Sequence, residues 1–160
     1  MIPRTIARVA SLAVLLTAAA ALLMLSHASL RAASDPWSPA QTVQPAVLLK
    51  ELSTPKSAPT IVFVGFNRLY TAGHVHGAQN HGMAGNEAGL QELKTWAASL
   101  PRSSNLVIYC GCCPMDRCPN VRPAFAALRD LGFNKLRVLI LPTDFAVDWA
   151  GKGYPYESGQ

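Results

Sequence analysis

One stretch of the sequence constrains the fold more than any other: an apolar run that leads into a loop carrying every cysteine of the chain. The run Leu106 to Tyr109 is short and continuously apolar, which predicts a buried strand. A helix is predicted from Val121 to Leu131, with Asn120 as a good N-cap residue. Between strand and helix lie all four cysteines, Cys110, Cys112, Cys113 and Cys118. Because helix N-termini favour thiolates, which are the reactive form of cysteine, we expect the chemistry in this loop.

The rest of the chain alternates between strand and helix patterns. The run 60–66 is apolar and β-branched, as in a strand buried on both faces, and we expect it to be the central strand. Residues 68–80 are expected to form a loop whose glycines allow tight turns. This alternation predicts an α/β domain with a parallel sheet and helices on both faces. The other predicted elements are a helix over 45–52, a helix over 87–100 ended by Pro101, a strand over 135–141, and a short helix or turn over 142–149.

Length and charge limit the classes of function. The chain has 160 residues, half of them hydrophobic, which suits one domain with a real core. Its net charge is +5, but the lysines and arginines are scattered, with no basic run and no aromatic residues interleaved to stack bases. We therefore expect no nucleic-acid partner, and favour a soluble basic protein with a few arginines facing a small anionic substrate.

The first 28 residues have the pattern of a secretory signal peptide. Arg4 and Arg8 precede an apolar run from Val9 to Leu25, and small residues follow at the positions that a signal peptidase inspects. This predicts a periplasmic or secreted protein. An uncleaved anchor is the alternative, because the run approaches the roughly 18–20 residues that span a bilayer. Residues 29–42 are predicted to be a flexible lead-in, with Trp37 tucked onto a domain over 43–157.

Three segments of this domain carry a family pattern. Residues 70–78 read Y-T-A-G-H-V-H-G-A, the strand 107–109 runs into Cys110, and residues 149–155 read W-A-G-K-G-Y-P. In this order and spacing they resemble the rhodanese-like domain family of sulfurtransferases. The resemblance implies a five-stranded parallel sheet flanked by helices. It also implies a cysteine at the base of a cradle-shaped loop that carries sulfur as a persulfide.

The sequence departs from this family in three places. Phe63 and Gly65 stand roughly where the family has an acidic residue and an arginine after the first core strand. Pro142-Thr143 replaces the glycine pair before the last helix. The loop after Cys110 is longer than the family's. These departures concern substrate and turnover rather than the fold.

Two registers compete for the catalytic cysteine. The strand register selects Cys110, the first residue after the predicted strand, whereas the family's four-residue spacing to an arginine selects Cys112, which precedes Arg117 by that spacing. We favour Cys110, since a sheet fixes the ends of its strands while loops tolerate insertion. A loop that ends on a helix N-terminus supplies N–H groups for an anionic persulfide.

Two arginines in the loop region are candidate substrate-binding residues. Arg117 and Arg122 can orient a thiosulfonate-like anion or lower the pKa of a thiol, the alternative being solvated surface charges. The predicted partner is thus a small sulfur-containing anion or a thiol, including a protein thiol as acceptor. No cofactor is expected.

The other thiols leave further hypotheses open. Cys112, Cys113 or Cys118 could resolve a persulfide or sulfenate on Cys110, which would make the protein an extracytoplasmic thiol–disulfide or sulfur-relay protein. A disulfide that only staples the long loop is the structural alternative. Adjacent cysteines 112 and 113 are not expected to pair with each other, because their Cα atoms lie about 3.8 Å apart, closer than a disulfide prefers.

A Cu(I) or zinc module on an inactive rhodanese fold is the alternative from a different class. Four thiolates suit these ions. The spacing nevertheless lacks the Cys-x2-Cys knuckles of structural zinc sites, and the histidines at 74, 76 and 81 lie in another segment, so we assign no metal ligand. A phosphatase would need an arginine six positions after its cysteine, and no cysteine of this chain has one.

Overall fold

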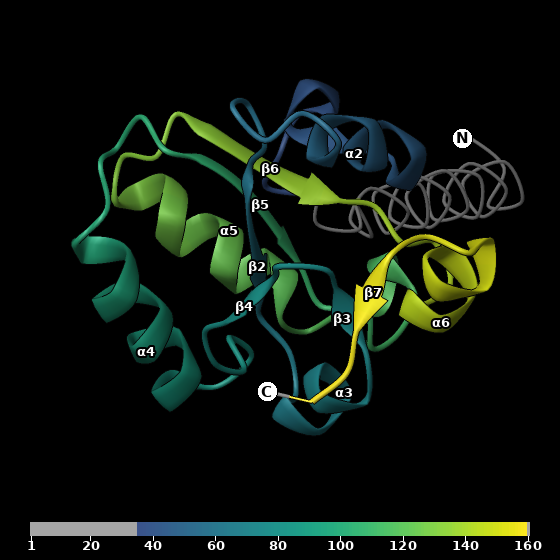
Figure 1. The fold of residues 1–160 in the computed structure, drawn as a ribbon. Helices are drawn as coiled ribbons and strands as arrows, with labels where there is room; N and C mark the ends of the chain where they lie inside the picture. The colour runs from purple at the N-terminus through teal and green to yellow at the C-terminus, as the bar shows by residue number, and fades with distance from the viewer. Residues whose placement is uncertain (1–34, 160) are drawn as a thin grey trace, which may run out of the picture. The chain divides into compact units, whose positions relative to one another are not determined.

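The structure, a computed structural model, describes residues 35–159. The predicted signal peptide over residues 1–28 lies outside the described residues. No helix within 35–159 has the length and apolar character needed to cross a membrane. In chain order the elements are β1 (Thr42–Val43), α2 (Pro45–Leu52), β2 (Thr60–Phe63), α3 (Asn67–Ala72), β3 (His74–Val75), β4 (Gln79–Asn80), α4 (Glu87–Ala98), β5 (Asn105–Tyr109), α5 (Val121–Asp130), β6 (Lys135–Leu139), α6 (Phe145–Asp148) and β7 (Tyr156–Glu157) (Figure 1).

Five strands form one parallel sheet in the order β1-β6-β5-β2-β4. The prediction that the 60–66 run is the central strand is wrong. The centre is β5, which pairs with β2 on one side and β6 on the other, and β2 has only the two-residue β4 beyond it. Both strands are continuously apolar because both are buried on both faces, so this pattern could not tell which of the two is central.

The segment predicted as a loop over 68–80 contains α3, β3 and β4. Side-chain bonds to the backbone hold these short pieces. The Tyr70 hydroxyl donates to the carbonyl of Ala78 over 2.6 Å, and the Val75 N–H donates to the Tyr109 hydroxyl over 2.9 Å. Elements this short have too few residues for hydrophobic periodicity to reveal. The longer predicted elements are all present, and the helix over 45–52 has the predicted bounds.

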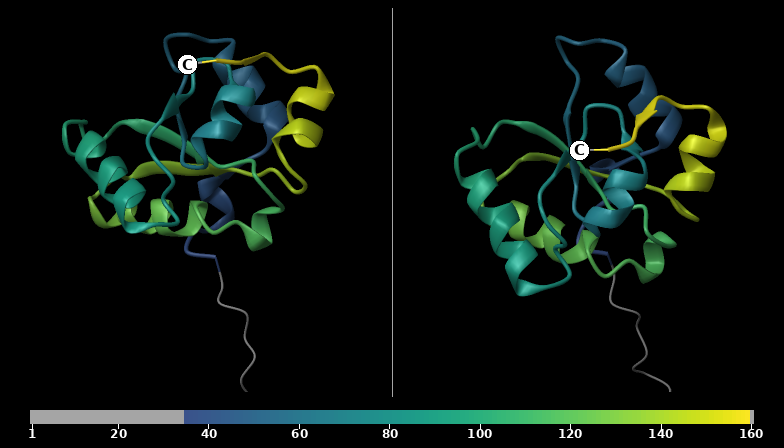
Figure 2. Two further views of the ribbon diagram at one scale, coloured as in Figure 1. Left: turned by 90° about the horizontal axis from the view of Figure 1, so that it is seen from below. Right: turned by 60° about the horizontal axis from the view of Figure 1, so that its bottom comes forward.

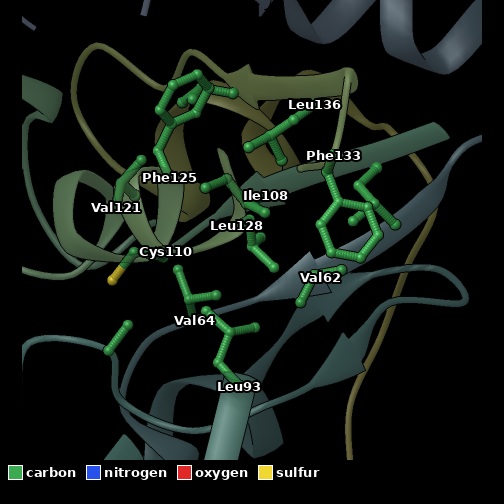
Figure 3. Packing of buried hydrophobic residues seen from close by; sticks show 14 of the residues in the cluster. Val62, Val64, Leu93, Ile108, Cys110, Val121, Phe125, Leu128, Phe133 and Leu136 are labelled. Carbon is green, nitrogen blue, oxygen red and sulfur yellow. The ribbon is translucent and has the colours of Figure 1, made fainter. Parts of the chain in front are cut away.

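Helices cover both faces of the sheet, as predicted. Helices α4 and α5 pack together on one face, where Leu93 and Phe125 meet Val62 and Ile108 from the strands (Figures 2 and 3). On the other face α2 and α3 pack against residues that alternate with these, including Val107. This alternation is the ordinary geometry of a strand, so the two cores follow from one sheet.

The residues just before β1 also pack on the domain. Trp37 is buried, and its ring meets the edge of Phe125 at a centroid distance of 5.5 Å. Asp35 forms an ion pair of 2.7 Å with Arg122 at the start of α5. The expectation that Trp37 sits on the domain is therefore confirmed.

Candidate active site

The cysteine loop begins at the carboxyl end of the central strand. Cys110 follows the last residue of β5 directly and is 1% exposed. Figure 3 shows it at one end of the core cluster beside Val121, with its sulfur directed away from the other labelled side chains. The loop contains one 3-10 turn, Met115–Arg117, and ends where α5 starts. Parallel sheets bind ligands at this edge, so the loop occupies the expected place.

Gly111 makes the chain turn immediately after Cys110. Its φ is +69°, a left-handed conformation that glycine adopts at low cost. A Cβ here would also lie 2.8 Å from the Cβ of Phe145, whose N–H donates to the Gly111 carbonyl over 3.1 Å. A side chain at this position would thus push the loop off the start of α6.

The loop brings three of the four sulfurs together. The Sγ atoms of Cys110, Cys112 and Cys118 all lie within 4.8 Å of one another. Cys113 stands outside this trio, although its Sγ is 3.0 Å from that of Cys112. All four cysteines are free. The sequence places them in one loop, but only the fold shows which three converge.

Cys118 is the thiol whose anion is best stabilised. The Cys110 thiol donates to its sulfur, and the backbone N–H groups of Asn120 and Val121 at the start of α5 do so too, which lowers the pKa of Cys118 to about 5. The same hydrogen bond, together with burial, raises the pKa of Cys110. Burial and a hydrogen bond to Cys112 raise the pKa of Cys113 to about 12.

Asn120 has a different role from the one that its position predicts. It occupies the N-cap position of α5, but its side chain makes no capping hydrogen bond. Instead its Nδ2 donates to the sulfur of Cys110 over 3.2 Å, and its Oδ1 accepts from the N–H of Gly85 over 2.8 Å. Asn120 is fully buried. The preference for Asn at N-cap positions picked out Asn120 in the sequence, but no local pattern could show that its side-chain amide faces Cys110.

Gly65 is a site residue that sequence reasoning noted only as a departure from the family. A Cβ at this position would lie 2.7 Å from the sulfur of Cys110 and 2.8 Å from Cζ of Phe63. The backbone after β2 therefore leaves just enough room for the sulfur. The apolar run through residue 66 hid this contact, since it suggested a continuing strand.

Neither of the two predicted substrate-binding arginines lines the cavity beside Cys110. The guanidinium of Arg122 binds other residues of the protein. Its Nε and Nη2 lie 2.9 and 2.7 Å from the Asp35 carboxylate, and its Nη1 donates to the carbonyls of Met115 and Cys118. It thereby ties the cysteine loop to α5. Arg117 is exposed at the end of the 3-10 turn. Their role toward a substrate stays a prediction.

A cavity of about 360 Å³ opens beside the first cysteines of the loop. Its lining is largely apolar and includes both Cys110 and Cys112, but neither arginine. Among the described residues that line it, Asp144 is the one charged side chain, and its Oδ1 accepts the N–H of Val147 as the cap of α6. The other lining residues are Phe63, Leu69, Ala72, Gly73, Gly111, Phe145, Ala146, Ala150 and Tyr156.

The remaining family-like residues support the fold. His74 stacks on Tyr70 and bonds to its carbonyl, and the Trp149 indole donates to the carbonyl of Pro155. Both His74 and His76 contact Glu157. These histidines are therefore engaged in the β3–β7 region, and the thiol trio has no histidine among its described neighbours that could act as a ligand.

No protein-family model matches the sequence, and no curated protein matches it either. Solved structures do match. The rhodanese-like domain of an Anabaena protein is 25% identical, with a TM-score of 0.55 over 74% of this chain and 79% of its own. Thiosulfate sulfurtransferase from Pseudomonas aeruginosa is 19% identical, with a TM-score of 0.52 over 74% of this chain and 19% of its own.

A third structure shows an EanB variant whose cysteine carries a persulfide, in a tetrahedral intermediate state with ergothioneine. It is 18% identical, with a TM-score of 0.54 over 73% of this chain and 28% of its own. Identities this low establish architecture rather than activity. The chain therefore has the α/β rhodanese-like fold, with its cysteines at the position of that fold's active loop.

Proposed function

We propose that this protein is a sulfurtransferase that carries sulfur as a persulfide on Cys110. The observation that carries the proposal is the position of Cys110, which follows the central strand directly and lines the cavity at its carboxyl end. Solved structures of the same fold include a thiosulfate sulfurtransferase and a protein with a cysteine persulfide, which supports this chemistry. We also propose that residues 1–28 are removed as a signal peptide, and that the protein works in the periplasm or outside the cell.

The first half-reaction loads the cysteine. The Cys110 sulfur attacks the outer, sulfane sulfur of a donor, a new S–S bond forms, and the donor's own bond to that sulfur breaks. The donor leaves with the electron pair, as sulfite does from thiosulfate. The proton of Cys110 passes to Cys118, whose sulfur lies within 4.8 Å of that of Cys110. The second half-reaction reverses the transfer, because an acceptor thiolate or cyanide takes the outer sulfur and Cys110 recovers its proton.

The surroundings of Cys110 suit the loaded state. Gly65 leaves no room behind the sulfur, so the added sulfur extends toward the cavity. The Asn120 amide donates to the inner sulfur. The amino end of α5 adds partial positive charge next to a persulfide anion. These contacts favour an anionic sulfur chain at this point.

Mass spectrometry of the protein after incubation with thiosulfate tests the proposal. The reduced full-length protein is treated with the donor, freed of excess reagent and digested. We expect a gain of one sulfur atom on the peptide of Cys110, removed again by cyanide. Cys110→Ser should show no gain, while Cys113→Ser, which alters a thiol outside the trio, should load normally.

Two outcomes contradict the proposal in different ways. Loading on Cys112 in place of Cys110 would show that the catalytic cysteine is the one set by the family's four-residue spacing to an arginine. No loading on any cysteine, with organic persulfides tried as well as thiosulfate, would exclude sulfur transfer.

A thiol–disulfide relay is the second candidate, because Cys118 lies within 4.8 Å of Cys110. A relay would give a disulfide between residues 110 and 118 that turns over with protein thiols but not with sulfur donors.

A further inference from the structure

We propose that Cys110, Cys112 and Cys118 form a three-coordinate thiolate site for a soft monovalent metal ion, Cu(I). The site goes beyond sulfur transfer, since it uses Cys112 and Cys118 as ligands in their own right. Its basis is the convergence of three sulfurs from different parts of the loop: one at the strand end, one after the Gly111 turn, and one before α5.

The spacing of the sulfurs fits a metal ion at their centre. Sulfurs bound to a tetrahedral zinc ion lie about 2.3 Å from the metal, and the same bond length in a plane of three ligands places the sulfurs about 4.0 Å apart. The three Sγ atoms here lie within 4.8 Å of one another, so small side-chain rotations bring them to that distance.

The ligand set selects the ion. Thiolates are soft ligands, which prefer Cu(I), while a structural zinc site is closed by four ligands. Within the described residues the cluster contains three thiols and no histidine or carboxylate. Cys113 is not one of the three thiols that all lie within 4.8 Å of one another, although its sulfur is 3.0 Å from that of Cys112, and His81 stacks on Trp96. A site that offers three sulfurs and nothing harder suits Cu(I) better than zinc.

The surroundings compensate the charge that three thiolates bring. Cys110 and Cys118 are both buried, and buried anions need hydrogen-bond donors. The Asn120 amide donates to Cys110, and the N–H groups of Asn120 and Val121 point at Cys118. Cys112 is half-buried and faces the cavity, which gives the ion a route in. Metal bound here would occupy Cys110 and so block persulfide formation.

Anaerobic competition for Cu(I) tests the site. The reduced full-length protein is titrated with Cu(I) in the presence of a chromophoric bicinchoninate chelator. We expect one equivalent to leave the chelator, and X-ray absorption of the loaded protein to show three sulfur neighbours. Cys112→Ser and Cys118→Ser should each weaken Cu(I) binding more than about tenfold. Each removes a direct ligand, and losing even a residue that only hydrogen-bonds to a ligand typically costs at least about tenfold in metal affinity. Cys113→Ser is the matched control and should bind as the parent does.

Three results would overturn the site: no uptake of Cu(I), equal binding by all three single variants, or preference for Zn(II) over Cu(I) in the same titration. The test separates this inference from sulfur transfer. Both reactions are measured on the parent protein, and a parent that loads sulfur on Cys110 but takes up no Cu(I) would exclude the metal site and keep the transferase. A protein that binds Cu(I) but takes up no sulfur would keep the metal site and exclude the transferase.

Discussion

At the scale of single residues, Asn120 connects three parts of the molecule. Its side chain bonds to the sulfur of Cys110 and to the backbone of Gly85, and its own N–H holds the sulfur of Cys118. A Cβ added at Gly85 would lie 2.6 Å from the Asn120 Oδ1, so the two positions fit each other closely. Asn120 is thus a residue that positions the reactive sulfur through one amide.

Asn120→Asp separates this positioning from support of the fold. The carboxylate keeps an acceptor for Gly85 but replaces the N–H donor at Cys110 with a negative charge, which opposes an anionic sulfur. We expect persulfide formation from thiosulfate to slow by roughly tenfold, the equivalent of one hydrogen bond of about 1.5 kcal/mol. Cyanolysis of the product at timed intervals measures the rate.

Asn120→Ala is the matched comparison. It leaves the Gly85 N–H without its partner and should lower the free energy of unfolding by about 1–3 kcal/mol, measured by urea denaturation. An Asp variant that loads sulfur at the parental rate would show that the amide does not act on Cys110.

At the scale of elements, α2 is fastened to β6 by an ion pair. Arg137 donates to both carboxylate oxygens of Glu51 over 2.8 and 2.7 Å. The hydrogen bond from Arg137 lowers the pKa of Glu51 below its ordinary value, against an opposing effect of partial burial. The pair remains partly solvated, so its contribution is no more than about 1 kcal/mol.

This pair predicts a pH-dependent part of stability. Because the pKa of Glu51 is lower in the folded protein, its stabilisation is present above the unfolded pKa, about 4.3, and is lost as the pH falls through the folded value. Glu51→Gln should therefore lower the urea midpoint at pH 7, with the difference shrinking near pH 3. Glu92→Gln is the control, since exposed Glu92 forms no ion pair within residues 35–159. A constant difference between the two pH values would contradict the assignment.

Element length decided what could be predicted. The helix over 45–52 and the strands near residues 106 and 135 have strong local patterns, and the structure contains them. The two-residue strands β3 and β4 depend on contacts such as Tyr70 to Ala78, which are invisible in a local window. For the same reason the sequence placed all cysteines in one loop but could not show which three sulfurs lie within 4.8 Å of one another.

At the scale of the whole molecule, the residues before β1 belong to the domain's surface. Arg122 lies between Asp35 and the carbonyls of the cysteine loop, with its guanidinium over the Trp37 ring at 5.7 Å. Arg122 thus fastens the residues before β1 to the loop, and its predicted role toward a substrate stays a prediction. No local pattern indicated this contact, because the partner at residue 35 is distant in sequence.

The predicted export signal can be tested on the whole chain. We expect the protein recovered from the periplasm or medium to begin at Ser29, because Arg4 and Arg8, the apolar run and the small residues occur together in the order that signal peptidase recognises. N-terminal sequencing measures this. Leu15→Arg, which interrupts the apolar run, should leave the precursor unprocessed. Recovery of the intact chain in the membrane fraction would instead favour an uncleaved anchor.

The central place of β5 also has a kinetic consequence. A strand paired on both sides and covered on both faces exchanges its amide hydrogens only through large-scale unfolding, whereas edge strands and loops open locally. Cys110 follows that strand directly, so its backbone is held by the last part of the sheet to open. Cys112 and Cys113, past the Gly111 turn, lie outside that protection. Cys110 therefore differs from Cys112 and Cys113 in the motion needed to expose its backbone, and a reagent too large for the cavity would reach its sulfur only when the cysteine loop or the sheet opens.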